Sequence, residues 1–161
     1  MTRHSALFVG SESLTIQCAE LWIAAGNDVT AVVTRSPDVA RWARARGLRT
    51  EEQSRDVAER LSGAGYDWLF SVANLHVLPN AMVSAAREGA INFHDGPLPR
   101  HAGLNAPVWA LLQGETRHGI AWHLIEGGID EGAILQAREF DIGPAETALT
   151  LNTRCFEAAI E

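Results

Sequence analysis

The sequence predicts an α/β fold in which an open, mostly parallel, Rossmann-like sheet carries helices on both faces. Short apolar runs rich in β-branched and aromatic residues alternate along the chain with helical patterns of apolar residues. Gly or Pro marks most of the turns between these segments. With 161 residues, of which 47% are hydrophobic, the chain is long enough to bury one compact core. We therefore expect residues 1–161 to form a single domain.

The first half of the chain shows this alternation most clearly. An apolar strand is expected to end at Gly10, and the helical pattern after it stops at Gly26. A second helix has Ser36 as its cap and Pro37 in its first turn, and Gly47 follows its end. In chain order we expect a strand at 6–10, a helix to 25, a strand at 29–34, a helix at 37–46, a helix at 54–61, a strand at 68–72, a helix at 79–87 and a strand at 90–94.

Two glycine-rich loops, at 95–103 and 126–132, interrupt the second half of the chain. Around them we expect a helix at 106–112, strands at 120–125 and 133–137, and a helix at 148–161. The last helical pattern has no cap, which favours a domain that is truncated or part of a longer chain. Because each loop follows a strand, and ligands of open α/β sheets bind beyond the carboxyl ends of the strands, we expect a site at these loops.

The charged residues exclude several function classes. Every basic residue other than His is Arg, so a Schiff-base Lys and a phosphate-loop Lys are both excluded. The formal net charge of −7 argues against a nucleic-acid partner, whose phosphates require clustered cations. Three residues of the densest basic group have helical spacing, and we interpret the group as a solvated helix face. It comprises Arg41, Arg44, Arg46 and Arg49.

Other features point to a cytoplasmic protein without a membrane partner. No apolar run approaches the roughly 20 residues that a membrane span needs, and the N-terminus lacks the apolar stretch of a signal peptide. Cys18 and Cys155 both lie in apolar helical patterns, which favours buried free thiols over a disulfide or a zinc site. We expect no metal.

Gly10 provides the first candidate motif, because it follows a strand and precedes a helix as in a dinucleotide-binding fold. That fold needs a Gly-x-Gly-x-x-Gly pattern so that the backbone can approach a pyrophosphate. Residues 10–15 contain Gly10 alone. The sequence therefore disfavours a nicotinamide-dependent oxidoreductase.

Asn92 and His94 form the second candidate, at the end of an expected strand. Side chains two positions apart on a strand point to the same face, so this pair can converge on one reacting atom. An amide can donate to a developing oxyanion and an imidazole can manage the proton of an attacking amine. The alternative is that both side chains satisfy backbone groups of the following loop.

Asp130 and His123 form the third candidate. An acidic side chain beside His94 would orient the imidazole and favour its charged form. Asp130 lies in the second glycine-rich loop and His123 on the strand before it. The alternatives are that Asp130 forms a turn or caps a helix, and that His123 is a core histidine.

The order of these residues resembles the folate-dependent formyltransferase family, which includes glycinamide ribonucleotide, methionyl-tRNA and amino-sugar formyltransferases. The shared features are an Asn-x-His at Asn92 and His94, a Leu-Pro-x-x-x-Gly loop from Leu98 to Gly103, and the later Asp130. The likeness is strongest over 91–136 and fainter over 68–79.

This resemblance implies formyl transfer from 10-formyltetrahydrofolate to a primary amine, without a metal. It implies that Asn92 stabilises the tetrahedral intermediate, that His94 handles the proton and that Asp130 tunes His94, with His123 as support. Two main-chain segments would line the pteridine of the folate, and a third loop would face the amine. The first segment is Ser71, Val72, Ala73, Asn74 and Leu75, the second is Glu126, Gly127, Gly128, Ile129 and Asp130, and the loop contains Pro97, Leu98, Pro99, Gly103 and Asn105.

The loop after His94 also bears on the acceptor. Gly96 and Pro97 stand where many family members have Ser-Leu, and Asn105 and Ala106 also depart from the family pattern. The sequence of this loop is similar to that of formyltransferase domains at the front of nonribosomal peptide and polyketide synthases. In those synthases the amine is an aminoacyl group on a carrier domain, and an adenylation domain follows. The length and the acidic charge disfavour a transfer-RNA acceptor. Two alternatives stay open: a free amino-sugar or small-amine formyltransferase, and a non-catalytic folate-binding or docking domain.

Overall fold

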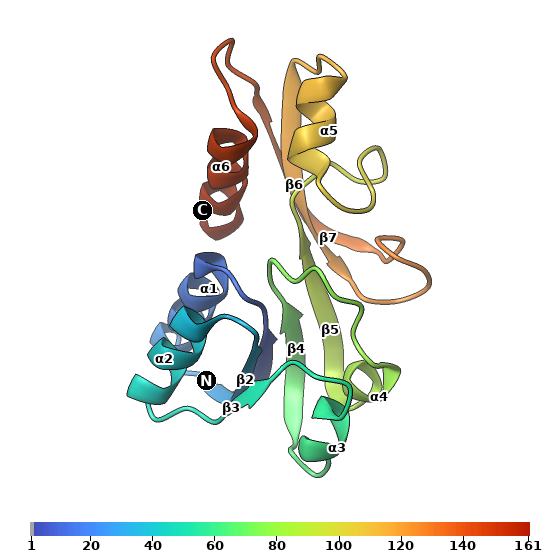
Figure 1. Cartoon of the computed structure of the whole chain (residues 1–161). Coiled ribbons are helices and arrows are strands. Elements are labelled where there is room, and N and C mark those ends of the chain that lie inside the picture. Colours follow the sequence, from blue (N-terminus) through green and yellow to red (C-terminus); the bar gives the residue numbers. More distant parts are fainter. Residues whose placement is uncertain (1) are drawn as a thin grey trace. The chain divides into compact units, whose positions relative to one another are not determined.

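The computed structural model describes residues 2–161 and confirms the α/β fold (Figure 1). Seven strands follow the order β3-β2-β1-β4-β5-β6-β7 in a mostly parallel sheet. The chain divides into two compact units, one that ends at Ile91 and one that comprises Asn92–Glu161. Each unit is described by itself below.

The first unit alternates strands and helices as predicted. Its elements are β1 (Ser5–Val9), α1 (Ser13–Ala24), β2 (Asp28–Thr34), α2 (Pro37–Ala45), β3 (Thr50–Glu52), α3 (Val57–Arg60), β4 (Tyr66–Ser71), α4 (Asn80–Ser84) and the larger part of β5 (Ala86–His94). β1 pairs in parallel with both β2 and β4, which buries its side chains from Ala6 to Val9 on both faces. In Figure 1, α1 and α2 lie on one side of these strands and α3 and α4 on the other.

In the first unit, one strand was not predicted and two predicted helices had wrong bounds. β3 was not predicted, because a polar edge strand of three residues carries no apolar alternation. The helix expected at 54–61 shrinks to α3, and the helix expected at 79–87 ends at Ser84. Ala86 and Arg87 belong instead to β5, where Arg87 forms an ion pair with Asp67 of β4. Strand pairing here overrides the helical propensity of these residues.

The second unit begins with the last residues of β5. It continues with α5 (Ala106–Leu112), β6 (Arg117–Leu124), β7 (Ile134–Asp141) and α6 (Ala148–Ile160). β6 and β7 are antiparallel, with a register shift between Trp122 and His123. α6 starts with a capping box of Thr147 and Thr150, and Trp122 of β6 donates its indole N–H to the carbonyl oxygen of Ala159 in α6. The three elements around β6 therefore pack as one structure.

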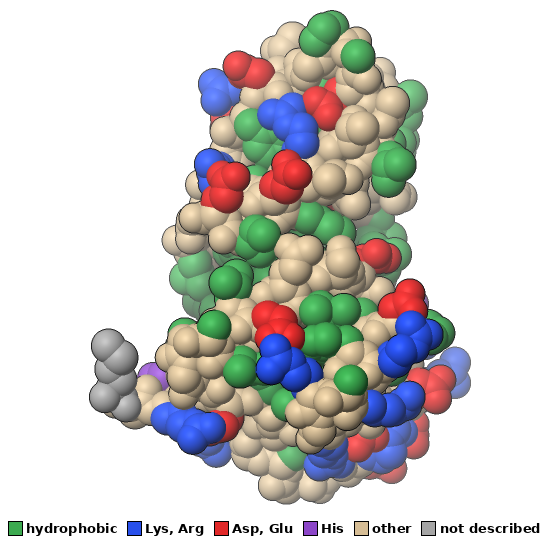
Figure 2. Space-filling view, turned by 90° about the vertical axis from the view of Figure 1, so that its left-hand side faces the viewer, with side chains coloured by type: hydrophobic (Ala, Val, Ile, Leu, Met, Phe, Trp, Pro, Cys, Tyr) green, Lys and Arg blue, Asp and Glu red, His purple; other side chains and the backbone are tan. Residues whose placement is uncertain are grey.

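The predictions for arginine and cysteine residues are confirmed in part. Because α2 ends at Ala45, Arg49 lies outside the predicted helix face. Cys155 is buried as predicted, whereas Cys18 is partly buried. Arg41 and Arg46 are exposed and form ion pairs with Asp38 and Glu20. Figure 2, which views the chain from the side of α1 and α2, shows Arg side chains beside Asp and Glu. Cys18 and Cys155 are free thiols, and burial raises the pKa of Cys18 to about 12 and that of Cys155 further. Within residues 2–161, no helix has the length and hydropathy that a membrane crossing needs.

Candidate active site

The end of β5 places Asn92 and His94 beside the predicted partners from other elements. His94 is buried, and its Nε2 lies 2.5 Å from the carbonyl oxygen of His101. Because a carbonyl oxygen only accepts, this nitrogen must carry the hydrogen. The neutral imidazole therefore has its free lone pair on Nδ1. That atom lies 3.6 Å from Oδ2 of Asp130.

Asp130 connects the two glycine-rich loops. Its backbone is left-handed, with φ of +58°, a conformation that Asp tolerates better than most residues. Its side chain is 9% exposed, and Oδ2 accepts a hydrogen bond of 2.8 Å from the backbone N–H of Gly103. The other oxygen, Oδ1, lies 3.4 Å from Nε2 of His123. A single carboxylate thus faces both histidines and fixes the loop after β5.

His123 completes this group and contacts Asn92 directly. Its Nδ1 donates to the carbonyl oxygen of Leu124 at 2.9 Å, and its Nε2 lies 3.1 Å from Nδ2 of Asn92. In the neutral imidazole, Nε2 accepts from the Asn92 amide, which orients that amide. His123 follows a register shift in the pairing of β6 with β7: it pairs with Ile134, and Leu135 is the extra residue on β7. We call Asn92, His94, His123 and Asp130 the histidine site.

The predicted substrate loop follows β5 and is tied down at two points. The backbone N–H of His101 donates to the carbonyl oxygen of Pro97 at 3.0 Å, and Gly103 bonds to Asp130 as described. Pro99 and Asn105 are exposed, and Pro97 and Leu98 are half-buried. Asn105 has φ of +61° and precedes α5 without capping it through its side chain. The loop is therefore anchored near His94 while its outer residues face solvent.

Sequence reasoning missed three residues beside His94: Asp95, His101 and His118. Both histidines are buried, and their rings lie 5.8 Å apart in an edge-on arrangement. Nε2 of His118 donates to the carbonyl oxygen of Asp95 at 2.8 Å. Burial raises the pKa of the Asp95 carboxyl and lowers the pKa of His118. The one signal in the sequence was the number of histidines between 94 and 123, which has no periodicity to reveal their contacts.

In the first unit, the predicted segment Ser71–Leu75 forms a compact turn after β4. The amide of Asn74 donates to the Ser71 hydroxyl and to the carbonyl oxygen of His76, and its oxygen accepts from the backbone N–H of His76. The hydroxyl of Thr15 donates to the carbonyl oxygen of Val72 at 3.0 Å. Gly10 is required beside it, because a Cβ at this position would lie 2.0 Å from the same oxygen. Gly10 thus serves close packing.

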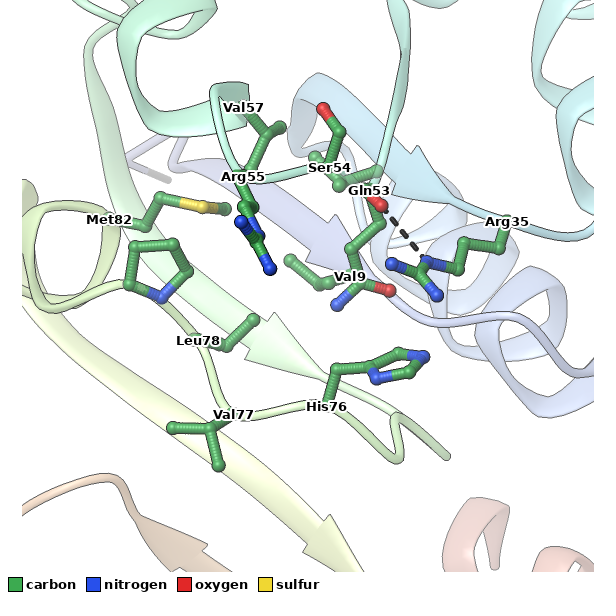
Figure 3. Close-up of a pocket in the computed structure, with 12 residues that line it drawn as sticks. Val9, Arg35, Gln53, Ser54, Arg55, Val57, His76, Val77, Leu78 and Met82 are labelled. Atoms are coloured by element: carbon green, nitrogen blue, oxygen red, sulfur yellow. Dashed lines mark hydrogen bonds between the residues drawn. The ribbon is translucent and has the colours of Figure 1, made fainter.

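A cavity of about 410 Å³ lies beside this turn, within the first unit (Figure 3). Its floor is apolar, and its polar lining includes two arginines, one histidine and no acidic residue. We call it the arginine cavity. It is lined by Val9, Val33, Arg35, Gln53, Ser54, Arg55, Val57, His76, Val77, Leu78, Pro79 and Met82.

Gln53 is the best-defined polar group of the arginine cavity. It is 7% exposed, and its side-chain Nε2 donates to Oδ1 of Asn74. Its backbone carbonyl oxygen accepts from Nε of Arg35. Its Oε1 is buried and has no hydrogen-bond partner in the structure. Buried acceptors without a partner are rare in native proteins. An occupant with an N–H donor and a negative charge would satisfy Oε1 and compensate the arginines.

The histidine site has the groups that acyl transfer to an amine requires. It offers an amide N–H donor, an imidazole with a free lone pair and a carboxylate within 3.6 Å of that imidazole. Among residues 2–161, no group of three or more His, Cys, Asp or Glu side chains is arranged to hold a metal.

Comparisons with known proteins agree with this geometry. The sequence matches the family model described as "Formyl transferase" over residues 24–161. It is 30% identical over 165 residues to the methionyl-tRNA formyltransferase of Solibacter usitatus, covering 92% of this chain and 53% of that protein. It is 35% identical over 114 residues to the corresponding protein of Geobacter sulfurreducens, covering 71% of this chain and 35% of that protein. The chain thus spans about half, or less, of the length of these curated relatives.

Solved structures share the fold. The structure of glycinamide ribonucleotide transformylase 1 from Symbiobacterium toebii superposes with a TM-score of 0.84 at 24% identity, covering 96% of this chain and 81% of that chain. A formyltetrahydrofolate deformylase from Pseudomonas syringae gives a TM-score of 0.86 at 14% identity, covering 99% of this chain and 58% of that chain. Proteins with this architecture thus include both a transformylase and a deformylase.

Proposed function

We propose that this chain, which belongs to the formyl transferase family, transfers the formyl group of 10-formyltetrahydrofolate to a primary amine. The observation that carries the proposal is that Asp130 faces both His94 and His123, and that His123 in turn contacts Asn92. In the reaction, the amine nitrogen attacks the formyl carbon, the bond from that carbon to N10 of the folate breaks, and the amine loses a proton. The products are a formamide and tetrahydrofolate.

His94 is the proposed group that manages the proton. Its Nε2–H is held by the His101 carbonyl oxygen, so Nδ1 is the atom that can take a proton from the attacking amine. Protonation places a positive charge on this ring, and Asp130 stabilises that charge from 3.6 Å. In this proposal, His94 is neutral before it takes the proton and charged afterwards.

Asn92 is the proposed donor to the oxyanion. One N–H of its amide is directed at Nε2 of His123, at 3.1 Å, which fixes the plane of the amide. The second N–H of the same group is then held in a defined direction at the end of β5. A donor fixed in advance stabilises a developing negative charge without reorganisation during the reaction. His123 supports this role by holding Asn92.

We propose that the arginine cavity takes the anionic tail of the folate. That tail, p-aminobenzoylglutamate, has an aromatic ring, an amide N–H and carboxylates. The apolar floor suits the ring, the buried Oε1 of Gln53 suits the amide N–H, and Arg35 and Arg55 suit the carboxylates. Contacts of the pteridine with the main chain of Ser71–Leu75, and with that of Glu126–Asp130, stay predictions.

For the acceptor, we propose an aminoacyl group on a carrier domain of a peptide or polyketide synthase. The similarity of residues 92–107 to synthase-associated formyltransferase domains supports this choice. The net charge of −7, without any Lys, disfavours a transfer RNA as acceptor. An amino sugar or another small amine is the alternative. Both acceptors present a neutral primary amine, so the histidine site serves either one.

Incubation with 10-formyltetrahydrofolate tests the proposal, with the release of tetrahydrofolate followed by absorbance. Separate arms contain an aminoacylated carrier domain, an amino sugar nucleotide, an aminoacylated transfer RNA and no amine. We expect release with the carrier-bound aminoacyl group, and mass spectrometry should show that this group has gained one formyl unit. Release in the arm without amine would instead indicate hydrolysis. Folate binding without release in any arm would indicate a non-catalytic domain.

A further inference from the structure

His118 lies outside the histidine site and is the least exposed of the four buried histidines. Its exposure is 0%, and its Nε2–H donates to the carbonyl oxygen of Asp95, the residue that follows His94. The thiol of Cys155, in α6, lies 3.7 Å from the same oxygen. Two buried donors from two elements therefore converge on one backbone atom next to His94.

His118 also supports the other backbone group that determines the orientation of His94. Its ring packs edge-on against the ring of His101, whose carbonyl oxygen accepts from Nε2 of His94. Gly96, in the same loop, packs closely against His101, because a Cβ at this position would lie 2.7 Å from the Cβ of Ala106 and 3.1 Å from that of His101. The loop between Asp95 and His101 is thus contacted by His118 at both ends.

We infer that His118 is a positioning residue, which holds His94 in the Nε2–H tautomer by fixing the backbone at Asp95 and His101. The inference rests on the proposed function, in which the lone pair on Nδ1 of His94 takes the proton. No contact joins His118 to Asn92, His123 or Asp130. Its effect must therefore pass through the loop and act on the geometry of His94.

Two variants separate the donor from the packing. His118→Phe keeps a ring against His101 and Phe140 but removes the N–H, and His118→Gln keeps a donor close to the position of Nε2. We expect His118→Phe to lower kcat about tenfold, with KM for the folate changed less than about twofold, and His118→Gln to retain kcat within about threefold. Equal losses in both variants would show that only packing matters and would overturn the inference.

The tautomer of His94 gives a readout that does not need activity. In the ¹⁵N-labelled protein, long-range ¹H–¹⁵N spectra should show His94 as the Nε2–H tautomer in the wild type and in His118→Gln, and as a mixture in His118→Phe. An unchanged His94 signal in His118→Phe would overturn the inference. If His118→Phe does not fold, His118→Asn replaces it, because the shorter amide cannot reach the position of Nε2. If the wild type transfers no formyl group, the proposed function fails, and these spectra still decide the role of His118.

Discussion

The arginine cavity and the histidine site both follow the ends of strands, yet their side chains are used in different ways. The cavity has an apolar floor, two arginines and no acidic residue, and the Oε1 atom of Gln53 is left without a partner. In the histidine site, contacts run from His94 to Asp130, from Asp130 to His123 and from His123 to Asn92, and each of the two histidines is at most 5% exposed. The polar groups of the cavity therefore lack acidic or donor partners of their own, whereas those of the histidine site are paired with one another.

In the proposed function, this difference separates a region that binds the folate from a region that reacts. An uncompensated pair of arginines attracts an anion but supplies no proton acceptor at neutral pH. Imidazoles beside a carboxylate can exchange protons in that range, and fixed contacts hold them in place before substrate arrives. Changes in the cavity should therefore alter KM, and changes in the histidine site should alter kcat.

The largest effect is expected from Asn92→Ala and His94→Ala. Each should lower kcat by about two to three orders of magnitude, because one removes the oxyanion donor and the other the proton acceptor. Steady-state kinetics with 10-formyltetrahydrofolate and the identified amine measure this loss. Asn152→Ala, on α6, is the matched control and should retain wild-type kinetics. Rates close to wild type in both site variants would exclude the histidine site as the catalytic centre.

Asp130→Asn should have the next largest effect. The amide keeps the shape of the side chain and can still accept from Gly103, but it removes the negative charge 3.6 Å from Nδ1 of His94. We expect kcat to fall about tenfold and the pH-rate profile to shift or flatten. The pH dependence of kcat is the measurement, with Asp141→Asn on the exposed strand β7 as control. A profile that overlays the wild-type curve would remove Asp130 from the mechanism.

Arg55→Gln tests the arginine cavity, where we expect an effect on folate binding rather than on turnover. Loss of one charge-assisted hydrogen bond should raise KM for 10-formyltetrahydrofolate about tenfold, with kcat changed less than about twofold. Initial rates over a range of folate concentrations give both constants. Arg44→Gln, on the exposed face of α2, removes the same charge away from the cavity and should change neither. A lower kcat with unchanged KM would contradict the assignment of the cavity to the folate tail.

The smallest effect is expected on the pH dependence of stability, from Asp67, whose carboxylate is paired with Arg87 in the first unit. The backbone N–H of Ser5, the Arg87 guanidinium and the Ser5 hydroxyl lower the pKa of Asp67 from 3.8 to about 2. Its stabilising contribution is therefore present above pH 4 and is lost as the pH falls toward 2. Urea unfolding between pH 4 and 2 should show a weaker pH dependence for Asp67→Asn than for the wild type. Asp38→Asn should match the wild type, and a wild-type slope in Asp67→Asn would refute this role.

Periodicity predicted most of the fold, with errors where local signals are weak. Continuous apolar runs marked β1, β2 and β4, because strands buried on both faces need apolar side chains at every position. The polar edge strand β3 and the start of β5 at Ala86 could not be predicted, since pairing with a neighbour decides both. The antiparallel pairing of β7 with β6 is likewise a property of the sheet.

The α/β fold, the absence of Lys chemistry and the candidates Asn92, His94, His123 and Asp130 could all be predicted, because they depend on residue type and on order along the chain. The folded chain was needed to show that one carboxylate faces two imidazoles and that His118 contacts the loop after His94. It also brought Arg35, Gln53 and Arg55 around one cavity. The physical reason is that contacts between loops depend on which strands are neighbours in the sheet, and local patterns along the chain do not encode this.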